Sequence, residues 1–214
     1  MYAPSYVHLR LHSEYSIVDG TVRIDEAIAA ALGDSMPALA LTDLANMFSL
    51  VKFYRAARAA GVKPIIGCDV WVKHESLRDQ PYRLLLLATA HEGYLKLCTW
   101  LTRAYRSNQH RGRAEFRREW FDEGTGGLIA LSGARDGDVG QGLLHGNAAA
   151  AGSAARAAAA RFPDRYYLEV QRAGHADDDM LVDATIRRAA DLDLPVVATH
   201  PVQFLRRGDF RAHE

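Results

Sequence analysis

The sequence is poor in cysteine, in net charge and in long apolar runs. Among its 214 residues only Cys68 and Cys98 are cysteines, too few for a disulfide scaffold and too far apart for a CxxC motif. Basic and acidic side chains number 26 each, which argues against a chain that holds nucleic acid by itself, because phosphate binding needs excess Lys and Arg. Apolar runs such as Leu84 to Ala88 are far shorter than the ~18 residues of a membrane span. With no signal-peptide core near its start, we expect a cytoplasmic protein with reduced thiols.

The sequence does have a regular alternation of short apolar runs with helix-like periods. Hydrophobic residues make up 49% and charged residues 24%, the balance of a globular protein. Strands are predicted over Tyr6–Leu11, Ala38–Leu41, Pro64–Val72, Tyr82–Ala88, Leu128–Leu131, Tyr166–Val170 and Pro195–Ala198. Strand–helix alternation at this spacing predicts an α/β fold with a mostly parallel sheet, open or closed into a barrel.

Helices are predicted where apolar residues recur every three or four positions. Such periods lie near residues 24–32, 95–105 and 180–190, and the alanine-rich segment 148–160 favours helix by propensity. A further helix has Asn46 as its expected N-cap, Gly61 as its stop, and an apolar face formed by Met47, Leu50, Val51 and Tyr54.

One connection is too short for a parallel crossover. Only Lys73–Pro81 joins two of the predicted strands, whereas a parallel crossover takes a dozen or more residues. We therefore expect one antiparallel hairpin, which would bring Asp69 of its first strand near Arg83 of its second. The basic segment Ser107–Arg118 is expected to be a surface loop or a frayed helix, solvated rather than bound to nucleic acid.

If the strands form a barrel, the residues just beyond their C-terminal ends share one mouth. Imidazoles and carboxylates there are ligand types that hold divalent metal ions. Each position alone is a weak signal, because an Asp after a strand is more often a helix cap or a turn residue. The polar residues in question are His12, Ser13, Thr42, Asp43, Gln171, Arg172, Thr199 and His200, with Asp19 in the loop after the first strand.

Several segments, in order along the chain, match sequence motifs of a known family. Residues 6–20 read YVHLRLHSEYSIVDG, and later segments read MPALALTD, VKFY, GVKPIIG, LSG, FPDRY and LPVVAT. The sequence resembles the N-terminal PHP (polymerase and histidinol phosphatase) domain of bacterial DNA polymerase III alpha subunits, in the standard replicative form. The resemblance covers essentially the whole chain. It implies that residues 1–214 form a single domain, a distorted TIM-like (β/α)7 PHP barrel with the one antiparallel hairpin.

The resemblance also implies a trinuclear metal site in the barrel mouth of active members, where phosphoesters are hydrolysed. Compared motif by motif, this chain keeps His12 and Asp19 and has Asp69 where a Glu is expected. These three residues are the predicted remnant of the site. The positions at which a ligand is replaced are Arg10, Leu44, Arg83, Ala134, Pro201 and Gln203. His200, one position before a replaced ligand, is expected to be a rim histidine rather than a surrogate ligand.

Most of the side chains at the replaced positions cannot bind a metal ion. The apolar ones cannot coordinate a metal, and a guanidinium has no free lone pair. Arg10 and Arg83 do carry fixed positive charge toward Asp19 and Asp69, so we predict guanidinium–carboxylate pairs in place of the metals. No cofactor is then expected in this chain, the alternative being one weakly bound zinc or manganese ion.

The resemblance implies a non-catalytic module in DNA replication. In lineages with such a degraded site, a separate 3′–5′ proofreading exonuclease subunit docks on the PHP domain. That subunit and the remaining polymerase domains of the same chain are the expected partners, with little direct DNA binding. The alternative is a residual metal-dependent phosphoesterase, either a 3′–5′ exonuclease or a pyrophosphatase. The family's Mg-dependent polymerase site lies beyond residue 214, so we expect an N-terminal fragment of a longer nucleotidyltransferase that does not polymerise alone.

Overall fold

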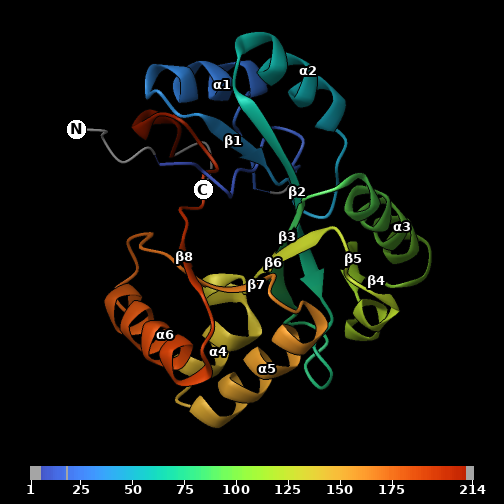
Figure 1. The fold of residues 1–214 in the computed structure, drawn as a ribbon, viewed down its shortest axis with the longest axis vertical. Coiled ribbons are helices and arrows are strands. Elements are labelled where there is room, and N and C mark those ends of the chain that lie inside the picture. Colours follow the sequence, from blue (N-terminus) through green and yellow to red (C-terminus); the bar gives the residue numbers. More distant parts are fainter. Residues whose placement is uncertain (1–5, 18, 211–214) are drawn as a thin grey trace.

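The computed structural model describes residues 6–17 and 19–210. Val18 of the opening motif and residues 211–214 lie outside these ranges. Figure 1 shows a central sheet with helices around its outside. The strands are β1 (Ala38–Leu41), β2 (Lys63–Val72), β3 (Tyr82–Ala88), β4 (Gln109–His110), β5 (Arg113–Phe116), β6 (Leu128–Leu131), β7 (Tyr166–Val170) and β8 (Val196–Ala198). The α-helices are α1 (Ile24–Gly33), α2 (Leu50–Ala60), α3 (His91–Ser107), α4 (Asp138–Leu144), α5 (Ala148–Arg161) and α6 (Asp178–Leu192).

The sheet is mixed, and an irregular segment closes it into a distorted barrel. Hydrogen-bonded neighbours follow the order β4-β5-β2-β3-β6-β7-β8, and β1 also pairs with β2. The antiparallel partners of β3 are β2 and β6, while β1–β2, β2–β5, β6–β7 and β7–β8 are parallel. The chain before β1 bridges the remaining gap, because Ala40 N donates to His8 O (2.9 Å) and Leu11 forms a bridge with Val202. The predicted α/β barrel is confirmed.

The first predicted strand, Tyr6–Leu11, is wrong as a regular strand, although the segment is extended. Its backbone hydrogen bonds in the described part of the chain are isolated ones with Ala40 and Thr42 at β1 and with Val202. A continuous ladder cannot form on the second side, because Pro201 has no N–H to donate. The other predicted strands are confirmed, as are the helices α1, α3, α5 and α6, and the short helix α4 is an addition.

The predicted antiparallel hairpin is confirmed in β2 and β3. The two strands pair from Ile66↔Ala88 to Val72↔Tyr82. Asp69 lies opposite Leu85, so Arg83 is its diagonal neighbour on the same face, within reach of a long side chain. The expected approach of Arg83 to Asp69 is therefore a consequence of strand register.

The expectation of a surface loop or frayed helix over Ser107–Arg118 is wrong. β4 and β5 form a small hairpin, whose turn residues Arg111 and Gly112 have φ of 49° and 79°, the left-handed pair that a tight two-residue turn requires. β5 then pairs in parallel with the end of β2. Glu115 in β5 is buried, with an oxygen 2.9 Å from Arg78 Nη1. Because Glu115 is charged although it is buried, the strand has the composition of a solvated segment in the sequence.

α2 begins later than predicted. It starts at Leu50, and Gly61 ends it with a φ of 81°, the left-handed C-cap that glycine favours. Asn46 is not its N-cap, since the Asn46 Oδ1 accepts a hydrogen bond from Phe48 N (3.1 Å) in the turn before the helix. The side-chain oxygen therefore satisfies a donor of that turn and leaves the helix start uncapped by Asn46.

The buried face of α2 also differs from the prediction. Phe53 and Ala57 pack into the core, whereas Val51 and Tyr54 are 64% and 47% exposed. Of the predicted apolar face, Met47 packs against the core and Leu50 is half-buried, so only Val51 and Tyr54 lie on the outer side. No helix in the described ranges is long and apolar enough to cross a membrane.

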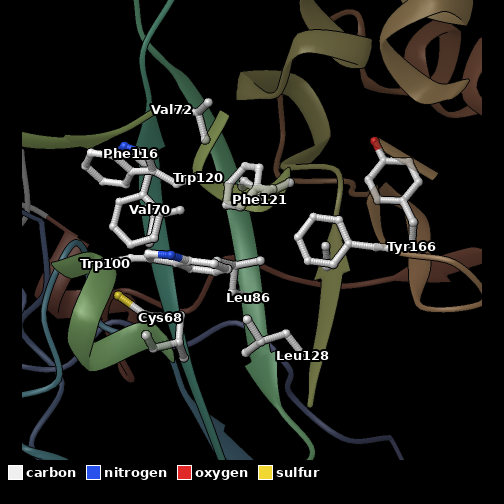
Figure 2. Packing of buried hydrophobic residues seen from close by; sticks show 14 of the residues in the cluster. Cys68, Val70, Val72, Leu86, Trp100, Phe116, Trp120, Phe121, Leu128 and Tyr166 are labelled. Carbon is white, nitrogen blue, oxygen red and sulfur yellow. The ribbon is translucent and has the colours of Figure 1, made fainter. Parts of the chain in front are cut away.

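The largest cluster of core residues supports the β2–β3 hairpin from the side of α3. Trp100 of α3 packs edge-on against Phe121 and Phe116, with ring centroids 5.4 and 6.1 Å apart, as Figure 2 shows. Pairs of this geometry add about 0.5–1.5 kcal/mol each beyond the burial of their area. Cys68 is a free thiol in the same cluster. This packing holds rigid the hairpin that carries Asp69 and Arg83.

Candidate functional site

A cavity of about 350 Å³ opens at the end of the barrel where β7 and β8 finish and β3 begins. This cavity lies at the barrel mouth that was predicted from the sequence. The charged and polar side chains singled out in the sequence that line it are Arg10, His12, Asp19, Arg83, Gln171, His200 and Gln203. The structure thus gathers residues that lie up to 193 positions apart in the chain.

Arg10 bridges two carboxylates from different strands. Its Nε and Nη2 donate to the two oxygens of Glu169 in β7 at 3.1 and 2.9 Å, and its Nη1 pairs with Asp69 in β2. All three side chains are buried. Burial by itself would lower the pKa of Arg10, but Asp69 and Glu169 raise it above its ordinary value. Arg10 is therefore a permanent cation inside the barrel.

Asp69 receives a second guanidinium, from Arg83. The Nε and Nη2 of Arg83 donate to the two Asp69 oxygens at 3.2 and 2.5 Å. The Arg83 guanidinium also lies 4.4 Å from the ring centroid of Trp71, which restrains its orientation. Burial would raise the pKa of Asp69, but the charges of Arg10 and Arg83 outweigh it and hold that pKa well below its usual value. Asp69 is therefore ionised at neutral pH.

His12 joins the two other residues of the predicted remnant. Its Nδ1 lies 3.0 Å from Asp19 Oδ1, and its Nε2 lies 3.2 Å from Asp69 Oδ2. Burial lowers the pKa of His12, but the hydrogen bonds to Asp19 and Asp69 more than offset this, so the pKa is raised above its ordinary value. With a carboxylate at each ring nitrogen, the imidazole donates twice and has no lone pair left for a ligand.

Asp19 completes this chain of hydrogen bonds near the cavity opening. It accepts from Ser16 Oγ at 2.9 Å and from Gln203 Nε2 at 3.2 Å. Burial would raise the pKa of Asp19, but the hydrogen bond from His12 and its charge lower it further than burial raises it. Gln203, a position at which the resemblance expects a metal ligand, thus acts as a donor to Asp19.

Glu169 belongs to the site and was missed from the sequence. Besides its pair with Arg10, it accepts hydrogen bonds from Gly133 N (3.1 Å), Gln171 Nε2 (3.1 Å) and Thr199 Oγ1. Gly133 has a φ of 82°, and a Cβ there would lie 2.2 Å from a backbone oxygen of β3, so only glycine fits this turn. A lone carboxylate inside the apolar strand β7 was the available signal, because an unpaired buried charge is too costly to persist.

The remaining replaced positions carry no coordinating side chain. Leu44 is buried, and its backbone forms a bridge with Asp69. Ala134 and Pro201 line the cavity. His200 is exposed at the cavity rim, and its ring centroid lies 6.5 Å from that of His8.

The cavity lining excludes five of the predicted mouth residues, namely Ser13, Thr42, Asp43, Arg172 and Thr199. The first three make buried hydrogen bonds away from the cavity. Asp43 accepts hydrogen bonds from Ser13 N (2.6 Å), Ser13 Oγ (2.9 Å) and Ser49 Oγ (2.6 Å). Thr42 Oγ1 accepts from the backbone of the opening segment at 2.9 Å. These contacts fasten the opening motif to the end of β1. Arg172 lies at the surface and pairs with an exposed carboxylate.

The charged groups of this network pair with one another. Two guanidinium groups, Arg10 and Arg83, and the imidazole of His12 contact three carboxylates, Asp19, Asp69 and Glu169. In the part of the chain that the structure describes, no group of three or more His, Cys, Asp or Glu side chains is arranged to hold a metal ion. Chemically, the arrangement ties the opening segment to β2, β3 and β7 by charge-assisted hydrogen bonds.

Comparison with protein families places this site in context. The family model described as "PHP domain" matches residues 8–173, a range that includes the six residues of this network. The chain belongs to the PHP domain family. The charged network of this PHP domain therefore lies within the residues that the family model matches.

The PHP domain is also similar in sequence to part of a replicative polymerase subunit. Over 217 aligned residues it is 48% identical to the DNA polymerase III subunit alpha of Neisseria meningitidis serogroup A, covering all of this chain and 19% of that protein. It is 42% identical over 214 residues to the subunit alpha of Escherichia coli K12, covering 18% of it. The matches lie in the N-terminal region of these subunits. The chain thus spans about a fifth of the length of the curated relatives it matches.

Solved structures confirm the fold class. An amidohydrolase from Chromobacterium violaceum superposes with a TM-score of 0.61 at 14% identity, covering 92% of the PHP domain and 87% of that chain. A Bifidobacterium adolescentis protein assigned as a metal-dependent phosphoesterase gives a TM-score of 0.58 at 10% identity, covering 95% and 90%. At such low identity the likeness shows the fold alone.

Proposed function

We propose that this PHP domain is a non-catalytic structural module of a replicative DNA polymerase III alpha subunit. It stabilises the polymerase chain and serves as the docking platform for a separate 3′–5′ proofreading exonuclease subunit. The full-length similarity to segments of alpha subunits supports the place in replication. The charge-filled cavity supports the absence of catalysis.

The observation that carries the proposal is the position of two guanidinium groups. Arg10 and Arg83 both donate to Asp69, and they stand where the family resemblance expects imidazole ligands. Positive charge that metal ions bring to active members is here brought by side chains that cannot leave. A divalent ion would have to displace both guanidinium groups and then approach a protonated His12, which Coulomb repulsion opposes.

The residues present do not fit the trinuclear metal site of active family members. Metal ligands must offer a deprotonated lone pair, but the His12 nitrogens are both engaged with carboxylates, and the pKa of His12 is raised. The oxygens of Asp69 and Glu169 accept hydrogen bonds from buried guanidinium groups. We propose that the domain holds no cofactor and that any Mg²⁺ belongs to the polymerase site of the parent chain.

The proposal extends to that parent chain. Because the sequence spans about a fifth of its relatives, we propose that residues 1–214 are one N-terminal domain of a longer DNA-directed DNA polymerase and contact its other domains. The equal numbers of basic and acidic residues, 26 each, support little direct DNA binding by this domain. A cytoplasmic location follows from the same role.

Metal content tests the proposal. The protein is purified without chelator, analysed by elemental mass spectrometry, then incubated with zinc or manganese, desalted and analysed again. We expect less than about a tenth of an equivalent per chain at both stages, since no open ligand set exists to retain an ion. A PHP phosphoesterase with intact ligands, treated in parallel, shows that the desalting step preserves tightly held ions.

One or more retained ions per chain would overturn the non-catalytic assignment. It would favour the residual phosphoesterase built on His12, Asp19 and Asp69, and assays of 3′–5′ exonuclease and pyrophosphatase activity would then decide the substrate. A metal-free protein that still hydrolyses these substrates would overturn the assignment in the same way.

A further inference from the structure

The outer face of α2 carries apolar side chains that the fold leaves uncovered. Phe48, in the turn that leads into the helix, is 68% exposed, Val51 is 64% exposed and Tyr54 is 47% exposed. Figure 1 shows α2 at the periphery of the molecule, away from the central sheet. The helix already buries Phe53 and Ala57 against the core. It therefore has two apolar sides, of which packing uses one.

Val51 and Tyr54 form one patch, because they are spaced by three residues and so lie on the same face of the helix, and Phe48 precedes them in the turn that leads into α2. Other helices expose apolar residues farther apart. On α6, Met180 and Ile186 are six positions apart, about 9 Å along the axis at 1.5 Å per residue. Scattered exposed apolar residues are ordinary, whereas contiguous ones mark protein–protein contact sites.

The patch is bordered by positive charge. α2 contains Lys52, Arg55 and Arg58 and no acidic residue. Among the described residues, the Lys52 ammonium lies 3.6 Å from an exposed Glu14 oxygen, and Arg55 and Arg58 have no ion pair or side-chain hydrogen bond. Unpaired cations around an apolar patch are complementary to a partner surface in which carboxylates flank apolar side chains.

We propose that the α2 outer face, made of Phe48, Val51 and Tyr54 and bordered by Lys52, Arg55 and Arg58, is where the exonuclease subunit docks. The docking segment presents apolar side chains to the patch and carboxylates to the cations. This inference rests on the docking role proposed above and adds to it the face and the chemistry of the contact.

A second concave surface competes for the same role and is less suited to it. A groove of about 950 Å³ lies between the β2–β3 connection and α5. Its arginine, Arg118, already pairs with Asp138 (2.6 Å) and lies over the Tyr82 ring. The groove therefore offers no unpaired arginine or lysine, and among its apolar lining residues only Leu77, 52% exposed, is as open as those of the α2 outer face.

The test measures binding of the exonuclease subunit from the same organism to the full-length polymerase chain by surface plasmon resonance. One variant removes apolar contact (Val51→Ser with Tyr54→Ser), and a second reverses charge (Arg55→Glu with Arg58→Glu). A matched control makes the same kind of change on α6 (Met180→Ser with Ile186→Ser), and Ala150→Arg obstructs the groove. All these positions are exposed, so unchanged melting temperatures confirm intact folding.

We expect each α2 variant to weaken binding by at least about tenfold, the loss typical of a central interface residue, and the control and groove variants to change it by less than about twofold. Added salt should weaken binding to the wild type more than to the charge-reversed variant, because the reversed variant has lost the attractive pairs.

Zero-length carbodiimide cross-linking gives an independent readout. Lys52 is one of only four lysines in the chain, so a cross-link from Lys52 to an Asp or Glu of the exonuclease subunit would identify the acidic docking segment. In the complex this link should form, and Lys52→Ala should abolish it.

The outcomes separate this inference from the function on which it rests. If the wild-type chain does not bind the exonuclease subunit, the docking role itself fails. If the wild type binds and the α2 variants bind within about twofold of it, the docking role stands and the α2 assignment is overturned. Loss of binding in Ala150→Arg alone would also overturn it, in favour of the groove.

Discussion

Replacing Arg10 with methionine should destabilise the protein strongly. The substitution keeps the length of an unbranched side chain but removes the charge and all the hydrogen bonds. Asp69 would keep Arg83 and His12 as partners. Glu169 would lose the cation that pairs with both of its oxygens and would keep only neutral donors among the described contacts. The cost therefore arises mainly at Glu169.

The size of the effect follows from burial. Both carboxylate side chains are fully buried and Arg10 is 7% exposed, and removing one partner of a buried pair costs about 3–5 kcal/mol. For a protein of this length, that cost corresponds to a fall in melting temperature of roughly 6–20 °C. The exposed pair of Arg172 and Asp179 gives the matched control, since Arg172→Met should cost only about 0–1 kcal/mol.

Urea denaturation followed by circular dichroism and by tryptophan fluorescence measures these differences, and agreement of the two probes checks two-state behaviour. Neutralising the orphaned acid as well, in Arg10→Met with Glu169→Gln, should recover about 1–3 kcal/mol relative to the sum of the single changes. The reasoning is refuted if Arg10→Met unfolds within about 1 kcal/mol of the wild type, or if the two substitutions are simply additive.

Three further predictions concern other buried polar groups. The pKa of His12 is raised in the folded protein. Its contribution to the free energy of unfolding is therefore complete below about pH 6.5 and declines as pH rises through the raised pKa. Chemical denaturation across alkaline pH should show this decline in the wild type and not in His12→Asn. Glu115→Gln should lower the free energy of unfolding by about 1–3 kcal/mol. It should also speed hydrogen exchange in residues 73–81, since Glu115 pairs with Arg78 of that connection, and unchanged exchange would contradict the prediction. The buried Tyr166 hydroxyl interacts with the Ser132 side chain but makes no hydrogen bond of regular geometry. Tyr166→Phe should therefore leave the free energy of unfolding unchanged or raise it by up to about 1 kcal/mol, and a clear loss would disprove this.

Much of the fold was predictable because its strands are continuous apolar runs. The runs that became β2, β3, β6 and β7 have too few polar residues to be anything but buried, and their bounds were predicted to within one residue. The segment of β5 was missed since burial of Glu115 depends on cations that include Arg78, a contact 37 positions away. The phase of α2 was misjudged because both of its sides are apolar, and periodicity alone does not say which side meets the core.

The candidate site was predictable where strand register sets a distance. The short connection fixed an antiparallel hairpin, and the hairpin placed Arg83 beside Asp69. Glu169 was not predictable in this way, because β7 and the opening segment meet through the order of the whole barrel rather than through a local turn. The pairing of Arg10 with both Asp69 and Glu169 could therefore not be predicted from the spacing of residues along the sequence.

The irregular first segment and the charge-filled cavity have one physical explanation. Residues 6–12 lack a continuous ladder, so few backbone hydrogen bonds hold them in the barrel wall. Arg10 and His12 lie in this segment, and their side chains reach Asp69 in β2 and Glu169 in β7. The buried ion pairs thus close the barrel where the backbone does not. On this argument the guanidinium groups, which stand where metal ligands are expected, now stabilise the closure of the barrel wall.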